Sequence, residues 1–219
     1  MRFSLQRTFL VLGALTFLLL GSVAAGPVTF TAGTTGSFGA GSSGGSVGNA
    51  GTTLTIGGTT ITFSSKTNEI NVTLDPAGVS SSNVTLGVFN ATSTSLSSVD
   101  GATFTLNVAF TLPSDVAPKP GIYNATLTGK INSGTSGASV TWSTTSLTFN
   151  SPSAGTFTLT LEPSTPINAP SSPDASRIRG VINYTNGPAP VPEPMTLMTL
   201  GSGLAGLATM LRRRKKSNL

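Results

Sequence analysis

The side chains that could carry out chemistry are few in this chain of 219 residues. It contains no His and no Cys, so the commonest general base at neutral pH and two common metal ligands are missing. Hydrolysis of a glycosidic bond by two carboxylates is the one reaction class left to weigh. Between residues 26 and 190 the carboxylates are Glu69, Asp75, Asp100, Asp115, Glu162 and Asp174.

Three of these carboxylates stand where backbone geometry alone accounts for an Asp. Asp75 precedes a proline, Asp100 precedes a glycine, and Asp115 lies in a proline-rich break. Asp is favoured in turns because its side chain bonds to nearby backbone groups. No Asp-x-Asp cluster indicates a calcium loop, and a Gly-x-Ser-x-Gly nucleophile would need a His. We therefore expect no enzymatic activity, no metal and no cofactor.

Trp142, Tyr123 and Tyr184 are the aromatic side chains that could stack on a sugar ring. A single Trp on a strand is more often an anchor of the core, because a large aromatic ring gains most from burial. The three rings nevertheless make a carbohydrate-binding module the main alternative to a purely structural protein.

The elements that must position these side chains have the pattern of short β-strands. After residue 52, Thr, Val, Ile and Phe alternate with a period of two between clusters of turn-forming residues. The expected strands cover residues 59–63, 70–74, 83–89, 103–112, 122–131, 139–142, 146–149, 156–161 and 177–184. No part of this region carries an apolar period of 3.6 residues, as a helix would. The pattern predicts an all-β fold, an antiparallel β-sandwich of jelly-roll or immunoglobulin-like type.

Residues 26–58 differ in composition from the strands that follow. From Gly33 to Gly58 the segment is dominated by Gly, Ser and Thr and has few large apolar side chains. This composition is typical of a linker or a loose surface segment. We therefore expect the β-sandwich domain to span residues 59–187, with residues 26–58 as a linker or loose N-terminal segment.

Residues 1–25 have the build of a secretory signal peptide. Arg2 and Arg7 precede an uncharged apolar run, and small residues lead up to Gly26. The apolar run is shorter than the roughly 20 residues that a spanning helix needs. We therefore predict cleavage between Ala25 and Gly26 rather than retention as an anchor.

The formal net charge of +5 is carried by the two ends of the chain. Residues 26–190 contain five basic and six acidic side chains, which leaves a net charge of −1. A nearly neutral body has little counterion release to drive binding to nucleic acid. Nucleic acid is therefore excluded as a partner.

The last segment, residues 188–219, has three consecutive parts. It opens with the motif Val191, Pro192, Glu193 and Pro194. An uncharged run follows at residues 195–211, and then comes the cationic cluster Arg212, Arg213, Arg214, Lys215 and Lys216. The uncharged run is at the short end of the spanning range, and cations directly after a transmembrane helix favour a cytoplasmic C-terminus.

These three parts together resemble the PEP-CTERM sorting signal of Gram-negative bacteria. The resemblance covers residues 191–216 and implies recognition by exosortase, a membrane-embedded protease that cleaves at or near the motif. It also implies release or transfer to the envelope, in a setting of exopolysaccharide and biofilm. An uncut membrane anchor is the alternative, although an anchor has no need of Pro192, Glu193 and Pro194.

The sequence therefore predicts an exported, non-enzymatic protein with a structural or adhesive role in the envelope or extracellular matrix. Before processing, a C-terminal helix would lie in the inner membrane with the cationic cluster in the cytoplasm. The mature form would be at the cell surface or extracellular. The expected partners are exosortase, the inner membrane in passing, and exopolysaccharide.

Overall fold

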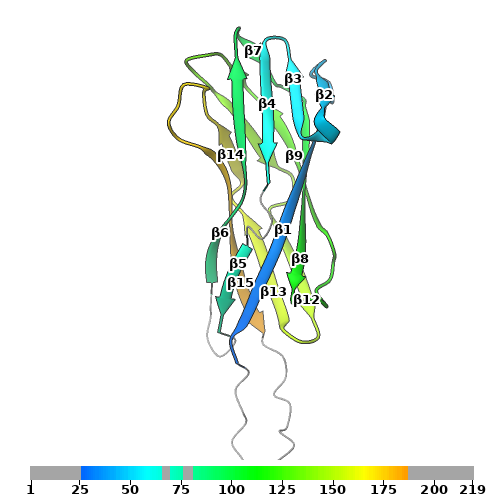
Figure 1. The fold of residues 1–219 in the computed structure, drawn as a ribbon. Helices are drawn as coiled ribbons and strands as arrows, with labels where there is room; N and C mark the ends of the chain where they lie inside the picture. Colours follow the sequence, from blue (N-terminus) through cyan, green and yellow to red (C-terminus); the bar gives the residue numbers. More distant parts are fainter. Residues whose placement is uncertain (1–25, 66–69, 76–80, 187–219) are drawn as a thin grey trace, which may run out of the picture. The chain divides into compact units, whose positions relative to one another are not determined.

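The computed structural model describes residues 26–65, 70–75 and 81–186 (Figure 1). These residues form two antiparallel sheets that pack face to face in a sandwich-like arrangement, with one sheet curled toward a half-barrel. In the described part of the chain the single helical element is the short 3-10 turn η1 (Asn49–Gly51). The expectation of an all-β, sandwich-like fold is confirmed.

The first sheet has six strands. In spatial order they are β14 (Ser164–Ile167), β11 (Ala138–Trp142), β9 (Gly121–Thr128), β8 (Thr103–Leu112), β1 (Val28–Gly39) and β5 (Ile70–Leu74).

The second sheet has seven strands. In spatial order they are β12 (Ser146–Ser151), β13 (Gly155–Leu161), β15 (Ser176–Asn186), β6 (Ser81–Ser93), β4 (Thr59–Ser64), β3 (Thr53–Ile56) and β2 (Ser46–Gly48). A small separate ribbon pairs β7 (Ser97–Ser98) with β10 (Lys130–Ile131).

Strand β8 shows how the alternating pattern becomes a buried face. Its bounds are those expected from the sequence, and Phe104, Leu106, Val108 and Phe110 are each no more than 1% exposed. The Thr, Asn and Ala residues between them point to the opposite face, as the period of two requires. The hydrophobic pattern therefore predicted the strand and its orientation, apart from Leu112, which the same pattern places on the buried face and which is 52% exposed at the end of the strand.

Residues 26–58 correct the expectation of a linker. They include β1, a strand of 12 residues that lies between β5 and β8 and pairs with both (Figure 1). The inward positions of β1 include Gly36, where a Cβ atom would lie 2.4 Å from Cζ of Phe104. Gly36 therefore permits close packing against a large ring, so a glycine-rich composition does not mark this segment as a linker.

Strand β14 was also missed, because its four residues include Pro166. It is an edge strand of the first sheet and pairs with β11 alone. An edge position tolerates a proline, since the missing N–H can face away from the ladder.

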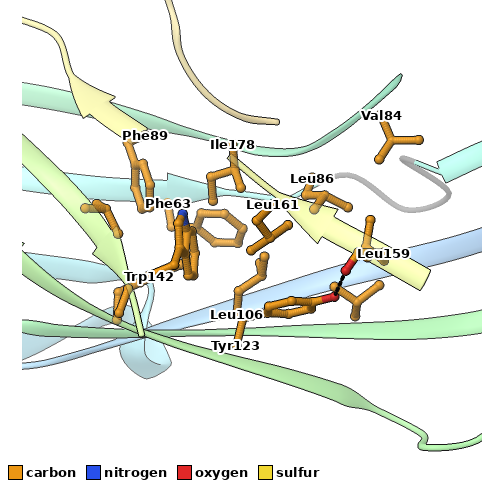
Figure 2. Packing of buried hydrophobic residues seen from close by; sticks show 14 of the residues in the cluster. Phe63, Val84, Leu86, Phe89, Leu106, Tyr123, Trp142, Leu159, Leu161 and Ile178 are labelled. Atoms are coloured by element: carbon orange, nitrogen blue, oxygen red, sulfur yellow. Dashed lines mark hydrogen bonds between the residues drawn. The ribbon is translucent and has the colours of Figure 1, made fainter. Parts of the chain in front are cut away.

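The core between the sheets contains two groups of aromatic rings. Ring centroids lie 4.9–6.1 Å apart in the group of Phe38, Phe63, Phe89, Phe104 and Trp142. They lie 4.5–6.4 Å apart in the group of Phe30, Phe110, Phe149, Phe157 and Tyr184. Most pairs are tilted or edge-to-face, the geometries that aromatic quadrupoles favour. Part of this core is seen in Figure 2.

Candidate functional site

The three aromatic residues considered for sugar stacking lie in the core. Trp142 and Tyr184 are 5% exposed and Tyr123 is fully buried. The Tyr123 hydroxyl donates a hydrogen bond of 2.8 Å to the backbone oxygen of Leu159 (Figure 2), and Trp142 Nε1 lies 3.4 Å from Thr165 Oγ1. Burial raises the pKa of both tyrosines. The rings present no free face to a ligand, so they do not form the stacking surface considered from the sequence.

Two of the carboxylates, Asp100 and Asp115, accept hydrogen bonds that hold turns in place. Asp115 accepts hydrogen bonds from the Ser151 hydroxyl at 2.6 Å and from the backbone N–H of Ser153 at 2.8 Å. Asp100 accepts from the Ser98 hydroxyl at 2.5 Å and from the Gly129 N–H at 2.6 Å. In each case the hydrogen bond from the serine hydroxyl is the largest cause, and together with the backbone N–H it holds the pKa of the carboxyl below the ordinary value. Both carboxylates therefore have a structural role as acceptors.

The sorting motif Val191 to Pro194, the cationic cluster at residues 212–216 and Ala25 lie outside the described residues, as does Glu69. In the described ranges no helix combines the length and apolarity needed to cross a bilayer. The same residues hold no group of three or more acidic side chains placed to bind a metal ion.

Charged side chains gather on the outer face of the second sheet, around the start of β15. Arg177 and Arg179 are exposed there, together with Glu162, which directly follows β13, and Asp174, which precedes β15. Lys119 and Lys130 are the other two basic side chains among the described residues. Half of the described cations are thus within one strand.

Two adjoining depressions mark this part of the surface. The first has a volume of about 530 Å³ and crosses β6, β15 and β13, and the second has a volume of about 490 Å³ and borders residues 168–175. Both are lined by Glu162 and Arg179, so they meet at these side chains. We call the combined depression the arginine groove. Its polar lining residues are Asn83, Thr85, Thr160, Glu162, Asn168, Asp174, Arg177, Arg179 and Asn183.

Strand periodicity places both arginines on the same face. Ile178 and Ile182 of β15 are buried in the core, so Arg177 and Arg179 point outward. A break in the register with β6 falls directly before Arg179. On the other side, the Glu162 N–H donates to the backbone oxygen of Arg179 at 3.0 Å. The positions of the two guanidinium groups are therefore set by the sheet rather than by a loop.

The loop that borders the second depression is held by Asn168. Its backbone N–H donates to the Ser176 hydroxyl at 2.7 Å, and its Nδ2 donates to the backbone oxygen of Asp174 at 3.0 Å. These two bonds join the end of β14 in one sheet to the start of β15 in the other. The loop that forms this wall of the groove is thus held at the end of β14 and at the start of β15.

Neither guanidinium forms an ion pair or a hydrogen bond with any described residue, although Glu162 and Asp174 line the same groove. Each guanidinium keeps its planar fork of N–H donors available, a geometry that matches the two oxygens of a carboxylate. No aromatic side chain lines either depression. The groove is therefore suited to hydrogen bonding and ion pairing, and not to ring stacking.

Sequence reasoning missed this groove, because it counted Arg177 and Arg179 only toward the net charge. The signal that could have revealed them is an Arg-x-Arg pair on an expected strand, since alternate residues of a strand share a face. The neighbouring Glu162, Asn83 and Asn168 come from distant parts of the sequence, and only the fold brings them together.

The chain was compared with protein-family models, with curated proteins and with solved structures, and none of these comparisons found a match.

Proposed function

We propose that this chain is an exported protein of the cell envelope or extracellular matrix that exosortase processes at its C-terminal segment. The observation that carries the proposal is the order of three parts at the end of the sequence. The Pro-Glu-Pro motif at residues 192–194 precedes an uncharged run at residues 195–211, and the cations Arg212 to Lys216 follow. A stop-transfer anchor accounts for the last two parts only.

A structural or adhesive role agrees with the character of the β domain. Its exposed strand faces are rich in hydroxyl and amide groups that bond across strands, such as Thr29 to Thr73 at 2.9 Å and Thr105 to Asn124 at 3.0 Å. The carboxylates Asp100 and Asp115 are engaged in turns. These features favour a rigid, hydrated module that presents a surface, rather than a catalytic centre.

The finer expectations belong to the same proposal. They are a jelly-roll or immunoglobulin-like arrangement of the strands, a cleaved N-terminal signal helix and a transmembrane helix in residues 195–211. The carbohydrate-binding alternative has lost the support of Trp142 but gains a different surface in the arginine groove.

The test of processing is the mass of the mature protein in cells with an active exosortase. An epitope at the C-terminus should be missing from the mature form, and mass spectrometry should place the new C-terminus at or near Pro192. Replacing Glu193 and Pro194 by Ala should leave the epitope attached. The matched control replaces Pro188 and Pro190 by Ala, which removes two prolines outside the motif.

Processing would be disproved if the epitope stayed on all of the exported protein in cells with an active exosortase. Equal retention in the control and in the motif variant would show that the motif has no special part in the cleavage.

A further inference from the structure

We propose that the arginine groove binds an acidic glycan, that is, a chain of hydroxyl-bearing rings that carry carboxylates at intervals. This inference deepens the adhesive role proposed above and rests on it. It gives that role a surface and a class of ligand.

The two guanidinium groups are the reason to expect carboxylates on the ligand. Arg177 and Arg179 are exposed, lie two residues apart on one face of β15, and have no partner among the described residues. A guanidinium binds a carboxylate through two parallel N–H bonds, which gives both affinity and orientation. Two such forks on one rigid strand favour a ligand with more than one acidic group.

The remaining polar side chains of the groove are the reason to expect hydroxyl groups on the ligand. Asn83, Asn183, Thr85 and Thr160 offer neutral donors and acceptors beside the arginines. Such groups can bond to hydroxyls, which are both donors and acceptors. An oligosaccharide presents hydroxyls and acidic groups together, whereas a lipid or an apolar peptide would leave the guanidinium and amide donors of the lining without acceptors.

The acidic residues of the groove disfavour nucleic acid as its ligand. Glu162 and Asp174 offset the charge of the two arginines, so the groove has no net formal charge. Binding to nucleic acid depends on the neutralisation of many phosphates by excess cations, and a single strand would also need aromatic side chains on which its bases could stack. A glycan with spaced carboxylates can reach the guanidinium groups without crowding charge against Glu162 and Asp174.

The shape of the groove agrees with an extended ligand. The two depressions meet at Glu162 and Arg179 and continue from β6 across β15 to residues 168–175. A linear chain can occupy both parts, with one acidic ring near Arg179 and another near Arg177.

The test measures binding of the purified full-length chain, in mild detergent, to immobilised polygalacturonate at low ionic strength. Fully methyl-esterified polygalacturonate is the matched ligand, because it keeps the rings and loses the charges. We expect replacement of both Arg177 and Arg179 by Gln to weaken binding by about tenfold or more. The control is Lys130→Gln, which removes an exposed cation of β10 and should leave the affinity unchanged.

A second variant guards against a folding defect. Thr85→Glu keeps both arginines and places a carboxylate opposite Arg179, its register partner on β6, so it should also weaken binding by repulsion of the acidic ligand. Far-ultraviolet circular dichroism and the thermal midpoint of every variant verify the fold.

Three results would overturn the proposal. They are equal binding by the double Gln variant and the unaltered chain, equal binding of the esterified polymer, and tighter binding of duplex DNA than of polygalacturonate. The first would assign the binding to another surface, such as the cations at residues 212–216. Because the measurement uses purified chain, it can fail while exosortase processing succeeds, and processing can fail while glycan binding succeeds.

Discussion

Tyr123 and Tyr184 show how two buried residues of one type can differ in their contribution to stability. Both rings are in the core, but the Tyr123 hydroxyl donates to the Leu159 oxygen, whereas the Tyr184 hydroxyl has no hydrogen-bond partner among the described residues. A buried polar atom without a partner costs free energy, since it loses its bonds to water and gains none.

The first prediction compares the two Tyr→Phe substitutions. Tyr123→Phe should lower the free energy of unfolding by about 1 kcal/mol, because a buried hydrogen bond is lost. Tyr184→Phe should leave that free energy unchanged or raise it by up to about 1 kcal/mol, because an unpaired hydroxyl is removed. Denaturant unfolding followed by fluorescence of Trp142 measures both. An equal loss in the two variants would contradict the assignment of partners.

The second prediction concerns acid stability and follows from Asp115. Its folded pKa lies below the ordinary value of about 3.9 because it accepts bonds from Ser151 and Ser153. The unfolded chain therefore takes up the proton first as the pH falls. The stabilising effect is complete above the unfolded pKa and is lost as the pH falls from about 4 through the folded pKa.

The measurement is the free energy of unfolding between pH 2 and pH 7. Asp115→Asn should be less stable than the unaltered chain at neutral pH and should depend less on pH on the acid side. Lys119→Gln serves as the control, since it removes a charge from the same connection between β8 and β9 and leaves the carboxylate in place. If the free energy of unfolding fell as steeply on the acid side in Asp115→Asn as in the unaltered chain, Asp115 would make no contribution to the pH dependence of stability.

At the scale of elements, β1 is the strand for which composition was misleading. Its glycines are typical of a linker in composition, yet they fall on two faces of a strand with different surroundings. A Cβ atom on Gly36 would lie 2.4 Å from Phe104 Cζ and 2.6 Å from Phe63 Cδ1, whereas nothing lies within 4 Å of the same atom on Gly33.

The third prediction is therefore a matched pair of Gly→Ala substitutions on β1. Gly36→Ala should destabilise the domain by about 1–3 kcal/mol, because the rings of the aromatic group are packed on all sides and cannot withdraw freely. Gly33→Ala should be neutral or slightly stabilising, because Ala loses less backbone entropy than Gly in a strand. Thermal and denaturant unfolding measure both. Equal effects of the two substitutions on stability would show that Gly36 is not closely packed against the aromatic rings.

The turn positions of Asp100 and Asp115 were predicted correctly from the sequence. Asp100 and Asp115 were assigned to turns from their neighbours in the sequence, and both accept backbone N–H bonds in turns. Local chemistry sufficed to place each Asp in a turn. The donors Gly129, Ser151 and Ser153 lie 29, 36 and 38 residues away in the sequence, so only the fold brings them to the carboxylates. The burial of Trp142 and the exposure of Arg179 depend on which face of a strand meets the other sheet, and single residues do not reveal this.

At the scale of the whole molecule, the charge of the chain depends on which segments it retains. The complete sequence carries +5, whereas residues 26–190 carry −1. Removal of the signal peptide and the cationic cluster would thus change the sign of the net charge. This change offers a measurement that does not depend on knowledge of the cleavage site.

The fourth prediction is a large shift in isoelectric point on processing. The precursor that accumulates in cells without exosortase should focus at basic pH, and the mature protein from cells with exosortase should focus at acidic pH. A precursor with the cationic cluster replaced by Gln is the control and should lose most of the difference. A mature protein that still focuses at basic pH would show that the cluster is retained.

The sequence by itself determined the β class, the bounds of β8 and β5, the placement of Asp100 and Asp115 in turns, and the three-part signal on which export and sorting are proposed. These features depend on period, neighbours and order, all of which are local. The tertiary structure alone decided that residues 28–39 form a strand between β5 and β8, that Trp142, Tyr123 and Tyr184 are buried, and that Arg177 and Arg179 share a groove with Asn83 and Asn168. Each of these outcomes depends on contacts between residues far apart in the chain, because packing against a distant partner decides which face of a strand is buried.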